Sequence, residues 1–242
     1  MFTEEVALAS LQNKMDYCDL HDDVTCHLRT SGTDVCTSFV WEKEFSLLRH
    51  LRDHEWLLWA DCDALITNFS RPLSSIVDAA GPDHNLIVIE DHNYYNLGVL
   101  MLRSGDWAEW LITELLKPRD VIEYSPGAWR DTKSFRDLVA KHPEVISRIK
   151  VVEKKRLQSY DMDWDLHDFI YHQPNCKYNL KTKMDGVLDC RRRFLSHSFR
   201  ISGSPNGIAE YKPRSLALEP DQYVSLSHRL RCLWRRMSQT WS

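Results

Sequence analysis

Apolar residues recur along the chain at spacings that predict helices. In residues 4–21 the apolar positions lie close to helical spacing, and residues 38–53 repeat the pattern with charged residues on the other side. We therefore predict one helix in each segment. Two further helices are predicted, at 106–117 with Asp106 as its N-cap, and at about 131–142.

Short apolar runs between these helices predict strands. Residues 56–60 have the sequence WLLWA and the run stops abruptly at Asp61, which is typical of a buried strand in a parallel sheet. Similar runs occupy 86–89 and 97–102, and a fourth strand is predicted at 149–153. Strands that alternate with helices indicate an α/β fold.

The last part of the chain has a weaker pattern. Residues 154–190 contain Pro174, Gly186 and many polar side chains, so we predict loops around a site or a substrate-specific excursion. Residues 205–220 are expected to be irregular. Residues 222–242 regain helical spacing with several arginines, which predicts a solvated basic helix or, as the alternative, a helix that docks to an anionic membrane surface or a partner.

Composition narrows the class of protein. The chain has 242 residues, of which 43% are hydrophobic and 27% charged, so it can bury one substantial core and is neither disordered nor fibrous. A formal charge of -4 gives no field that would attract nucleic acid. No apolar run reaches the length of about 18 residues that a membrane span needs.

The cysteines and one sequence triplet bear on the compartment without deciding it. The seven cysteines lack the CxxC pairs of zinc sites, and their odd number leaves at least one thiol free or paired between chains. Asn68-Phe69-Ser70 matches the N-glycosylation pattern, which is common by chance. The compartment therefore stays open.

Two acids follow the first predicted strand directly. Asp61 and Asp63 lie one residue apart, at the carboxyl end of a strand, where ligands of α/β sheets gather. Mn²⁺ and Mg²⁺ prefer oxygen ligands and bind through carboxylates together with substrate phosphates. The pair therefore predicts a metal site for a diphosphate-containing substrate; the alternative is a solvated loop or a helix cap.

The string WLLWADCDALITNF, preceded by Trp41 and Lys43, resembles glycosyltransferase family 34, which includes plant xyloglucan xylosyltransferases and fungal galactosyl- and mannosyltransferases. Three other segments are similar to motifs of that family, and together they cover about residues 10–200. They are the helix segment Asn13–His21, the strand Asn96–Arg103 with the following Trp107, and the late Phe194–His197.

The resemblance implies a fold and an activity. The fold is the GT-A class of α/β fold, with a Rossmann-like mixed sheet flanked by helices, and we expect the catalytic domain at 1–204, followed by the irregular segment and basic helix of 205–242. The activity is transfer from a nucleotide sugar such as UDP-galactose, UDP-xylose or GDP-mannose to a glycan or glycoprotein, with retention and with Mn²⁺ or Mg²⁺. The expected compartment is the Golgi lumen if a membrane anchor was removed from the sequence, and the cytoplasm otherwise.

Two departures from the family pattern are visible. The family normally has a strand beside the nucleotide base ahead of the Asn-Lys helix, and this chain starts too late to hold it, so we expect a truncated donor site. The family also carries an Asp-Asp-Gln triplet on a later helix, whereas Asp131 here is followed by Thr132 and Lys133. The usual contacts to the transferred sugar are therefore in question.

The resemblance assigns roles to individual residues. The predicted metal ligands are Asp61, Asp63 and His197. The residues predicted to contact the donor are Lys14, Tyr17, Lys43, Asp61, Asn96 and Gly98. The sequence does not choose between a covalent intermediate and attack from the leaving-group side, and the candidate catalytic carboxylates are Glu90, Asp91 and Asp131.

Each role has a structural alternative, and two rival functions stay open. Lys14 and Lys43 have the alternative of facing water, as a lysine on an amphipathic helix usually does, and Asp131 has the alternative of an ordinary helix N-cap. One rival is a metal-dependent phosphohydrolase, against which the order of the motifs argues. The other is an inactive module that only binds sugar nucleotides.

Overall fold

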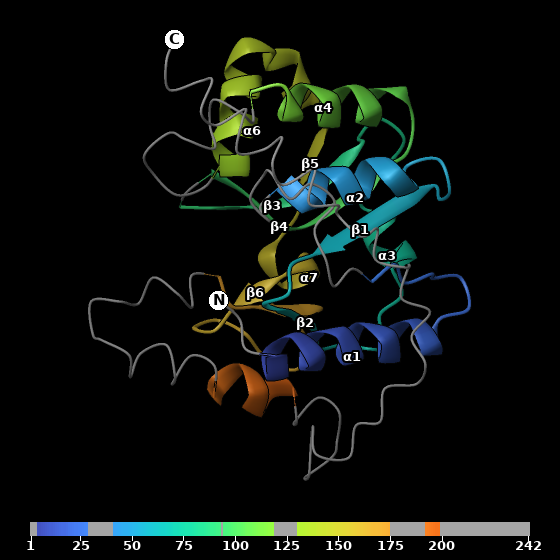
Figure 1. Ribbon diagram of the computed structural model, residues 1–242, viewed down its shortest axis with the longest axis vertical. Coiled ribbons are helices and arrows are strands. Elements are labelled where there is room, and N and C mark those ends of the chain that lie inside the picture. The colour runs from blue at the N-terminus through green and yellow to red at the C-terminus, as the bar shows by residue number, and fades with distance from the viewer. Residues whose placement is uncertain (1–3, 29–40, 93, 119–129, 175–191, 199–242) are drawn as a thin grey trace, which may run out of the picture. The chain divides into compact units, whose positions relative to one another are not determined.

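The computed structural model describes residues 4–28, 41–92, 94–118, 130–174 and 192–198 (Figure 1). The chain divides into two compact units. The first comprises Met1–His27, Trp56–Arg103 and Val145–Arg214, and the second comprises Leu28–Glu55, Ser104–Glu144 and Ser215–Ser242.

A mixed four-stranded sheet forms the centre of the first unit. The strand order is β1-β4-β3-β5, with bounds β1 Trp56–Ala60, β4 Tyr94–Arg103, β3 Leu86–Asp91 and β5 Ile149–Val151. β4 is antiparallel to both β1 and β3, whereas β3 and β5 are parallel. The run at 56–60, predicted to be a buried parallel strand, is β1, which pairs antiparallel with β4 and buries only Leu57. The run at 97–102, also predicted to be parallel, is antiparallel to both of its neighbours. The reason is that only two residues join β3 to β4, which permits a hairpin but no crossover.

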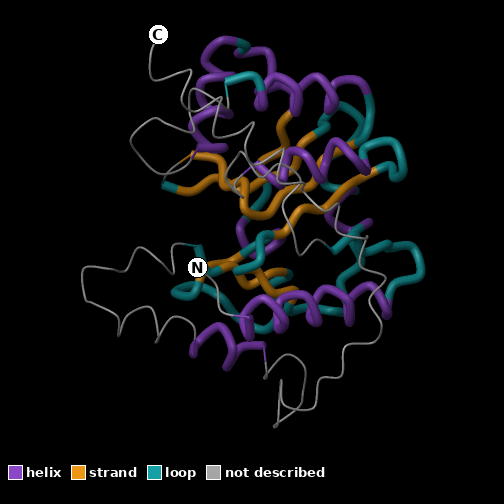
Figure 2. Tube along the Cα trace, viewed as in Figure 1, coloured by secondary structure: helices purple, strands orange, loops and turns teal. Residues whose placement is uncertain are grey.

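A second, three-stranded sheet lies in the same unit. β2 (Ala64–Ile66) pairs antiparallel with β7 (Ile170–His172), which is parallel to β6 (Ser159–Tyr160). In Figure 2 these strands form the lower orange group, next to α1. The prediction of loops throughout 154–190 is wrong for its first part, because β6 and β7 lie there; residues 175–191 are outside the described chain.

The helix predicted at residues 4–21 is confirmed as α1 (Glu4–Leu20), and it packs on β2 of the second sheet. The buried Asn13 fixes it, because its amide nitrogen donates to the Ile66 carbonyl at 2.8 Å and its amide oxygen accepts from Ile66 N–H at 2.7 Å. A disulfide between Cys18 and Cys26 follows at the end of the helix. The anchored helix holds β2 directly after the acid pair.

The core of the first unit fills the space around both sheets. β3 is buried from Leu86 to Ile89, as expected of a central strand that is covered on both faces. Short helices add to the packing, namely α3 (Ser74–Val77), α7 (Lys154–Leu157) and the 3₁₀ helix Pro143–Arg148. The buried cluster includes Tyr17, Ile66, Ile76, Ile87, Ile89, Val99, Met101, Leu157 and Phe169.

Three helices form the described part of the second unit. α2 (Glu42–His50) contacts α4 (Asp106–Leu116), which in turn contacts α6 (Arg130–Lys141). The predicted helices are confirmed, but Asp106 is the first residue of α4 and not its cap. Gly105, at φ 140°, takes the cap position, and Asp106 pairs with Arg52 at 3.0 Å.

The predicted basic helix at 222–242 and the irregular 205–220 lie outside the described residues. In the part of the chain that the structure describes, no helix is both long and apolar enough to cross a bilayer.

Candidate metal centre

The strand order gathers polar side chains at one edge of the main sheet. β1 and β3 are parallel to one another because each is antiparallel to β4, so their carboxyl ends meet at one edge together with the start of β4. This places Asp61, Asp91 and Asn96 at the same edge. β7 adds His172 to the group, because His172 pairs with Ala64, the residue after Asp63.

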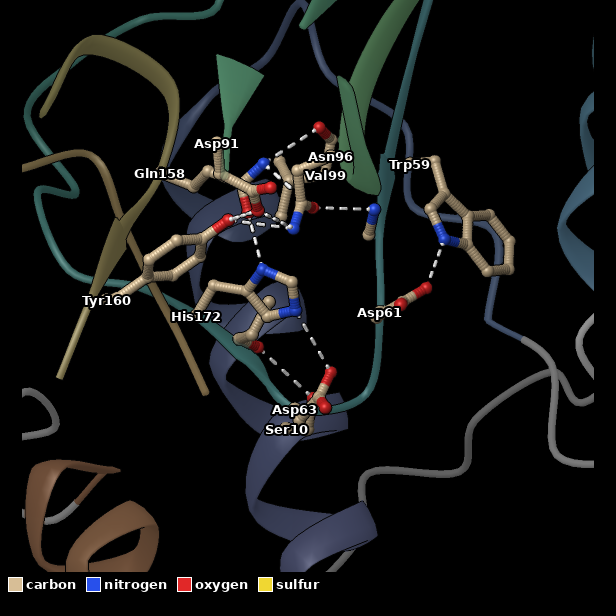
Figure 3. A network of polar contacts seen from close by, with 12 residues as sticks. Ser10, Trp59, Asp61, Asp63, Asp91, Asn96, Val99, Gln158, Tyr160 and His172 are labelled. Atoms are coloured by element: carbon tan, nitrogen blue, oxygen red, sulfur yellow. Dashed lines mark hydrogen bonds and ion pairs between the residues drawn. The ribbon is translucent and has the colours of Figure 1, made fainter. Parts of the chain in front are cut away.

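Asp61, Asp63 and His172 form a cluster that we call the metal triple. One potential ligand atom from each of them lies within 4.8 Å of the others. His172 Nε2 is directed at Asp63 (Figure 3), and it lies 3.4 Å from Asp63 Oδ1. The His172 side chain is buried, and its Nε2 atom has no hydrogen-bond partner. A buried nitrogen without a partner is costly, and a cation between it and the two carboxylates would remove that cost.

Trp59 and the backbone orient Asp61. The Trp59 indole Nε1 donates to Asp61 Oδ1 at 2.6 Å, and the backbone N–H of Asp61 donates to the Gly98 carbonyl at 2.8 Å. The hydrogen bond to Oδ1 fixes the orientation of the Asp61 carboxylate. Such outer contacts hold the ligands of metal sites in position.

Gly98 backs the metal triple closely. A Cβ atom at this position would lie 2.5 Å from His172 Cε1 and 3.0 Å from Asp61 Oδ2. No real side chain fits at such distances, so only glycine lets β4 approach the triple this closely. Gly98 was predicted to contact the donor; the structure places it directly behind the metal triple.

Lys14 of α1 lies close to the acid pair Asp61 and Asp63. Its Nζ donates to Ser10 Oγ at 2.6 Å and to the Ala64 carbonyl at 2.9 Å. Burial lowers the pKa of Lys14 to about 8, although nearby Cys62, Asp63 and Asp61 act in the opposite direction. The lysine, predicted to contact the donor, therefore lies within electrostatic range of the two acids.

Tyr17 belongs to the core. Only 1% of the residue is exposed, its hydroxyl donates to the Arg71 carbonyl at 2.7 Å, and its ring packs against Phe69 and Phe169. Burial raises the pKa of its hydroxyl. Tyr17, predicted to contact the donor, thus packs α1 against the core of the first unit, and its hydroxyl is engaged by the Arg71 carbonyl.

A chain of hydrogen bonds connects the metal triple to Asp91. His172 Nδ1 contacts Gln158 Oε1 at 2.5 Å, and Gln158 Nε2 donates to Asn96 Oδ1 at 3.2 Å. Asn96 Nδ2 donates to Tyr160 Oη at 2.8 Å and to Asp91 Oδ2 at 3.2 Å. The Tyr160 hydroxyl donates to the same Asp91 oxygen at 2.5 Å (Figure 3). The Asn96 side chain, predicted to reach the donor, is thus engaged inside the protein.

The remaining candidate acids have different surroundings. Glu90 is exposed and, as the neighbour of Asp91 in β3, points to the other face of the strand. Asp131 lies in the second unit, where its carboxylate pairs with Lys43 Nζ at 2.5 Å. The structure therefore joins these two predicted site residues, Lys43 and Asp131, to each other.

His197, predicted to be the third metal ligand, lies outside the metal triple. Its ring packs 4.6 Å from the rings of both Trp164 and Tyr171, and its Nε2 is 3.7 Å from Asp161 Oδ1. The residue that lies with the acids is His172, which sequence reasoning missed. The signal was present, because His172 ends the short apolar run Phe169-Ile170-Tyr171 as Asp61 ends WLLWA.

The chain is similar in sequence to curated glycosyltransferases. Over 186 residues the chain is 23% identical to an alpha-1,2-galactosyltransferase of Schizosaccharomyces pombe, covering 62% of this chain and 47% of the relative. Over 118 residues it is 29% identical to xyloglucan 6-xylosyltransferase 4 of Arabidopsis thaliana, covering 42% of this chain and 21% of the relative. The chain thus spans less than half of the length of these curated relatives.

A crystal structure of a glycosyltransferase involved in glycosylation of the major capsid of PBCV-1 superposes with a TM-score of 0.55 at 15% identity, over 80% of this chain and 95% of that one. This likeness shows the fold, which is GT-A as predicted. Residues 2–78 and 74–183 match the galactosyl transferase GMA12/MNN10 family, so that the match includes the metal triple and ends before His197. The chain therefore belongs to the galactosyl transferase GMA12/MNN10 family, glycosyltransferase family 34.

Proposed function

We propose that this chain is the catalytic part of a metal-dependent glycosyltransferase that moves a hexose or pentose from a nucleotide sugar to a glycan. Family membership supports the class of reaction. The observation that carries the metal dependence is the metal triple, in which two carboxylates converge with a buried histidine nitrogen that has no hydrogen-bond partner.

The residues present fit a divalent cation. Two carboxylates suit Mg²⁺ and Mn²⁺ alike, whereas an imidazole favours the transition metal. We therefore propose Mn²⁺, held by Asp61, Asp63 and His172. His172 takes the place that the sequence assigned to His197, because His197 packs between aromatic rings and lies beyond the family match.

The chemistry follows from how the residues are arranged. A bound cation supplies charge neutralisation for the diphosphate that leaves with the nucleotide. Trp59 orients Asp61, Gly98 leaves room for the triple, and Lys14 provides a positive charge close to where the phosphates would lie. Fixed groups of this kind lower the barrier because they need no rearrangement during the reaction.

The three candidate catalytic carboxylates are not equivalent. Asp91 is connected to the metal triple through Asn96 and Gln158, whereas Glu90 is exposed on the other face of β3 and Asp131 is paired with Lys43. We therefore propose Asp91 as the carboxylate that acts next to the transferred sugar. Tyr17 is left out of the proposed donor site because it is buried in the core.

The relatives support a proposal for the donor, the acceptor and the stereochemistry. An alpha-1,2-galactosyltransferase and xyloglucan xylosyltransferases lead us to propose UDP-galactose or UDP-xylose as the donor, with GDP-mannose as a further candidate. An α-linked product from an α-linked donor would mean retention. The acceptor would be a glycan or a glycoprotein.

The experiment is release of nucleoside diphosphate from these three donors, with Mn²⁺ and with chelator. We expect one donor to be turned over only with Mn²⁺, and Asp63→Asn to reduce turnover at least about 100-fold. Asp78→Asn is the matched control, since Asp78 is an exposed acid of the same unit, and it should retain full turnover.

Three outcomes would contradict the proposal. Full turnover in the Asp63→Asn variant would exclude the metal triple as the catalytic centre. Release of nucleoside monophosphate and sugar phosphate in place of nucleoside diphosphate would favour the phosphohydrolase alternative, and binding of a donor without any release would favour an inactive binding module.

A further inference from the structure

We propose that Gln158 is a positioning residue that fixes the tautomer of His172, and that the backbone of β4 fixes Gln158 in turn. The part of this inference that concerns the metal rests on the proposed function. The part that concerns the tautomer is a property of the metal-free protein and is tested separately.

The first anchor is the Val99 carbonyl, which can only accept a hydrogen bond. Gln158 is fully buried, and one of its side-chain atoms lies 3.2 Å from the Val99 oxygen. That atom must be the amide nitrogen, since an amide oxygen there would face another acceptor. The orientation of the Gln158 amide is thereby determined by the backbone.

The second anchor is the backbone N–H of Gly98, which can only donate. It donates to Asn96 Oδ1 at 2.9 Å, so the Asn96 amide oxygen must face β4 and its amide nitrogen must face Tyr160 and Asp91. The same Asn96 oxygen accepts the second hydrogen of the Gln158 amide at 3.2 Å. Two neighbouring backbone groups of opposite polarity therefore impose the same orientation on Gln158.

The consequence for His172 is direct. With its amide nitrogen facing Val99 and Asn96, Gln158 presents its oxygen to His172 Nδ1 at 2.5 Å. A neutral imidazole that contacts an acceptor at Nδ1 carries its proton there, which leaves the lone pair on Nε2. Nε2 is the atom directed at Asp63, and a lone pair at that position is what a metal ion requires (Figure 3).

Two substitutions separate positioning from packing. Gln158→Met keeps the length of the side chain but offers no strong acceptor, whereas Gln158→Glu keeps an acceptor for His172 Nδ1. Both variants lose the amide donors to Val99 and Asn96, so both should unfold at a lower temperature in chelator. Positioning predicts that Mn²⁺ affinity, measured by the loss of the free Mn²⁺ signal in electron paramagnetic resonance, falls about 10- to 100-fold in Gln158→Met and less than about 3-fold in Gln158→Glu.

The tautomer is measured on the metal-free wild-type chain by two-bond ¹H–¹⁵N correlation at about pH 8, where an ordinary imidazole is neutral. The His172 signals are assigned by their absence in His172→Gln. Protonation at Nδ1 supports the inference, and protonation at Nε2 overturns it. Equal loss of Mn²⁺ affinity in the two Gln158 variants would also overturn it, since a packing role would affect both alike. A wild-type chain with the Nδ1 tautomer that binds no Mn²⁺ would refute the metal in the proposed function but support the tautomer assignment.

Discussion

The two faces of β7 hold two histidines in contrasting ways. Neighbouring residues of a strand point to opposite faces, so Tyr171 and His172 serve different environments. On one face, the Tyr171 ring packs against His197, and its hydroxyl donates to Asp161 Oδ1 at 3.0 Å. On the other, His172 is held by Gln158 at one nitrogen and directs the other toward Asp63.

The difference separates a packed imidazole from a positioned one. His197 packs against the Trp164 and Tyr171 rings, and its Nε2 is 3.7 Å from Asp161 Oδ1. His172 Nδ1 contacts the oxygen of Gln158, whose amide is oriented by groups of fixed polarity. A metal ligand needs the second kind of support, and this contrast leads us to assign His172, and not His197, to the metal triple.

Among substitutions around His172, Gly98→Ala is predicted to have the largest effect on Mn²⁺ affinity and on stability. The new Cβ would lie 2.5 Å from His172 Cε1, so either the imidazole or β4 must move. We expect the free energy of unfolding to fall by about 1–3 kcal/mol and Mn²⁺ affinity to fall about 100-fold, as measured by chemical denaturation and calorimetric titration. Unchanged Mn²⁺ affinity would show that metal binding does not need the space that the missing side chain of Gly98 leaves next to His172.

A smaller effect on the same face is expected from Trp59→Phe. This substitution removes the indole N–H that donates to Asp61 Oδ1 at 2.6 Å and keeps an aromatic ring. Loss of one orienting hydrogen bond should lower Mn²⁺ affinity about 10-fold, at the lower end of the range for such contacts. Trp164→Phe is the control, because its indole donates to Thr67 and not to a ligand; a similar loss there would mean that the effect is not specific to Asp61.

The smallest effect on metal binding is expected from Tyr171→Phe, on the His197 face. Its hydroxyl donates to Asp161 at 3.0 Å, and removing it should cost about 1 kcal/mol in the free energy of unfolding. Mn²⁺ affinity should be unchanged, because the hydroxyl has no contact with the metal triple. A loss of Mn²⁺ affinity of more than about 3-fold would show that the Tyr171 side of β7 also influences metal binding, contrary to the separation proposed here.

The sequence predicts the half of the site that local patterns determine. WLLWA followed by Asp61 and Asp63 identifies a strand and its acid pair without any tertiary information, although only Leu57 of that strand is buried. The helix of residues 4–21 is likewise confirmed, as are the helices that became α4 and α6. These elements depend on spacing along the chain alone.

The other half depends on contacts that are distant in sequence. β2 and β7 have three residues each and pair across about a hundred residues of chain, so no periodicity marks them. His172 lies next to the acids only because of that pairing. Its contact with Gln158, and the contact of Gln158 with Asn96, cannot be predicted from the sequence. The direction of β4 was missed for a similar reason, since an apolar run looks alike in parallel and antiparallel sheets.

The most direct test is a Mn²⁺ titration of three chains side by side, namely the wild type, His172→Ala and His197→Ala, followed by electron paramagnetic resonance. We predict that the wild type binds one Mn²⁺ ion, that His172→Ala weakens binding about 100-fold, and that His197→Ala stays within about 3-fold of the wild type. Loss of binding in His197→Ala with retention in His172→Ala would contradict the assignment of the metal triple.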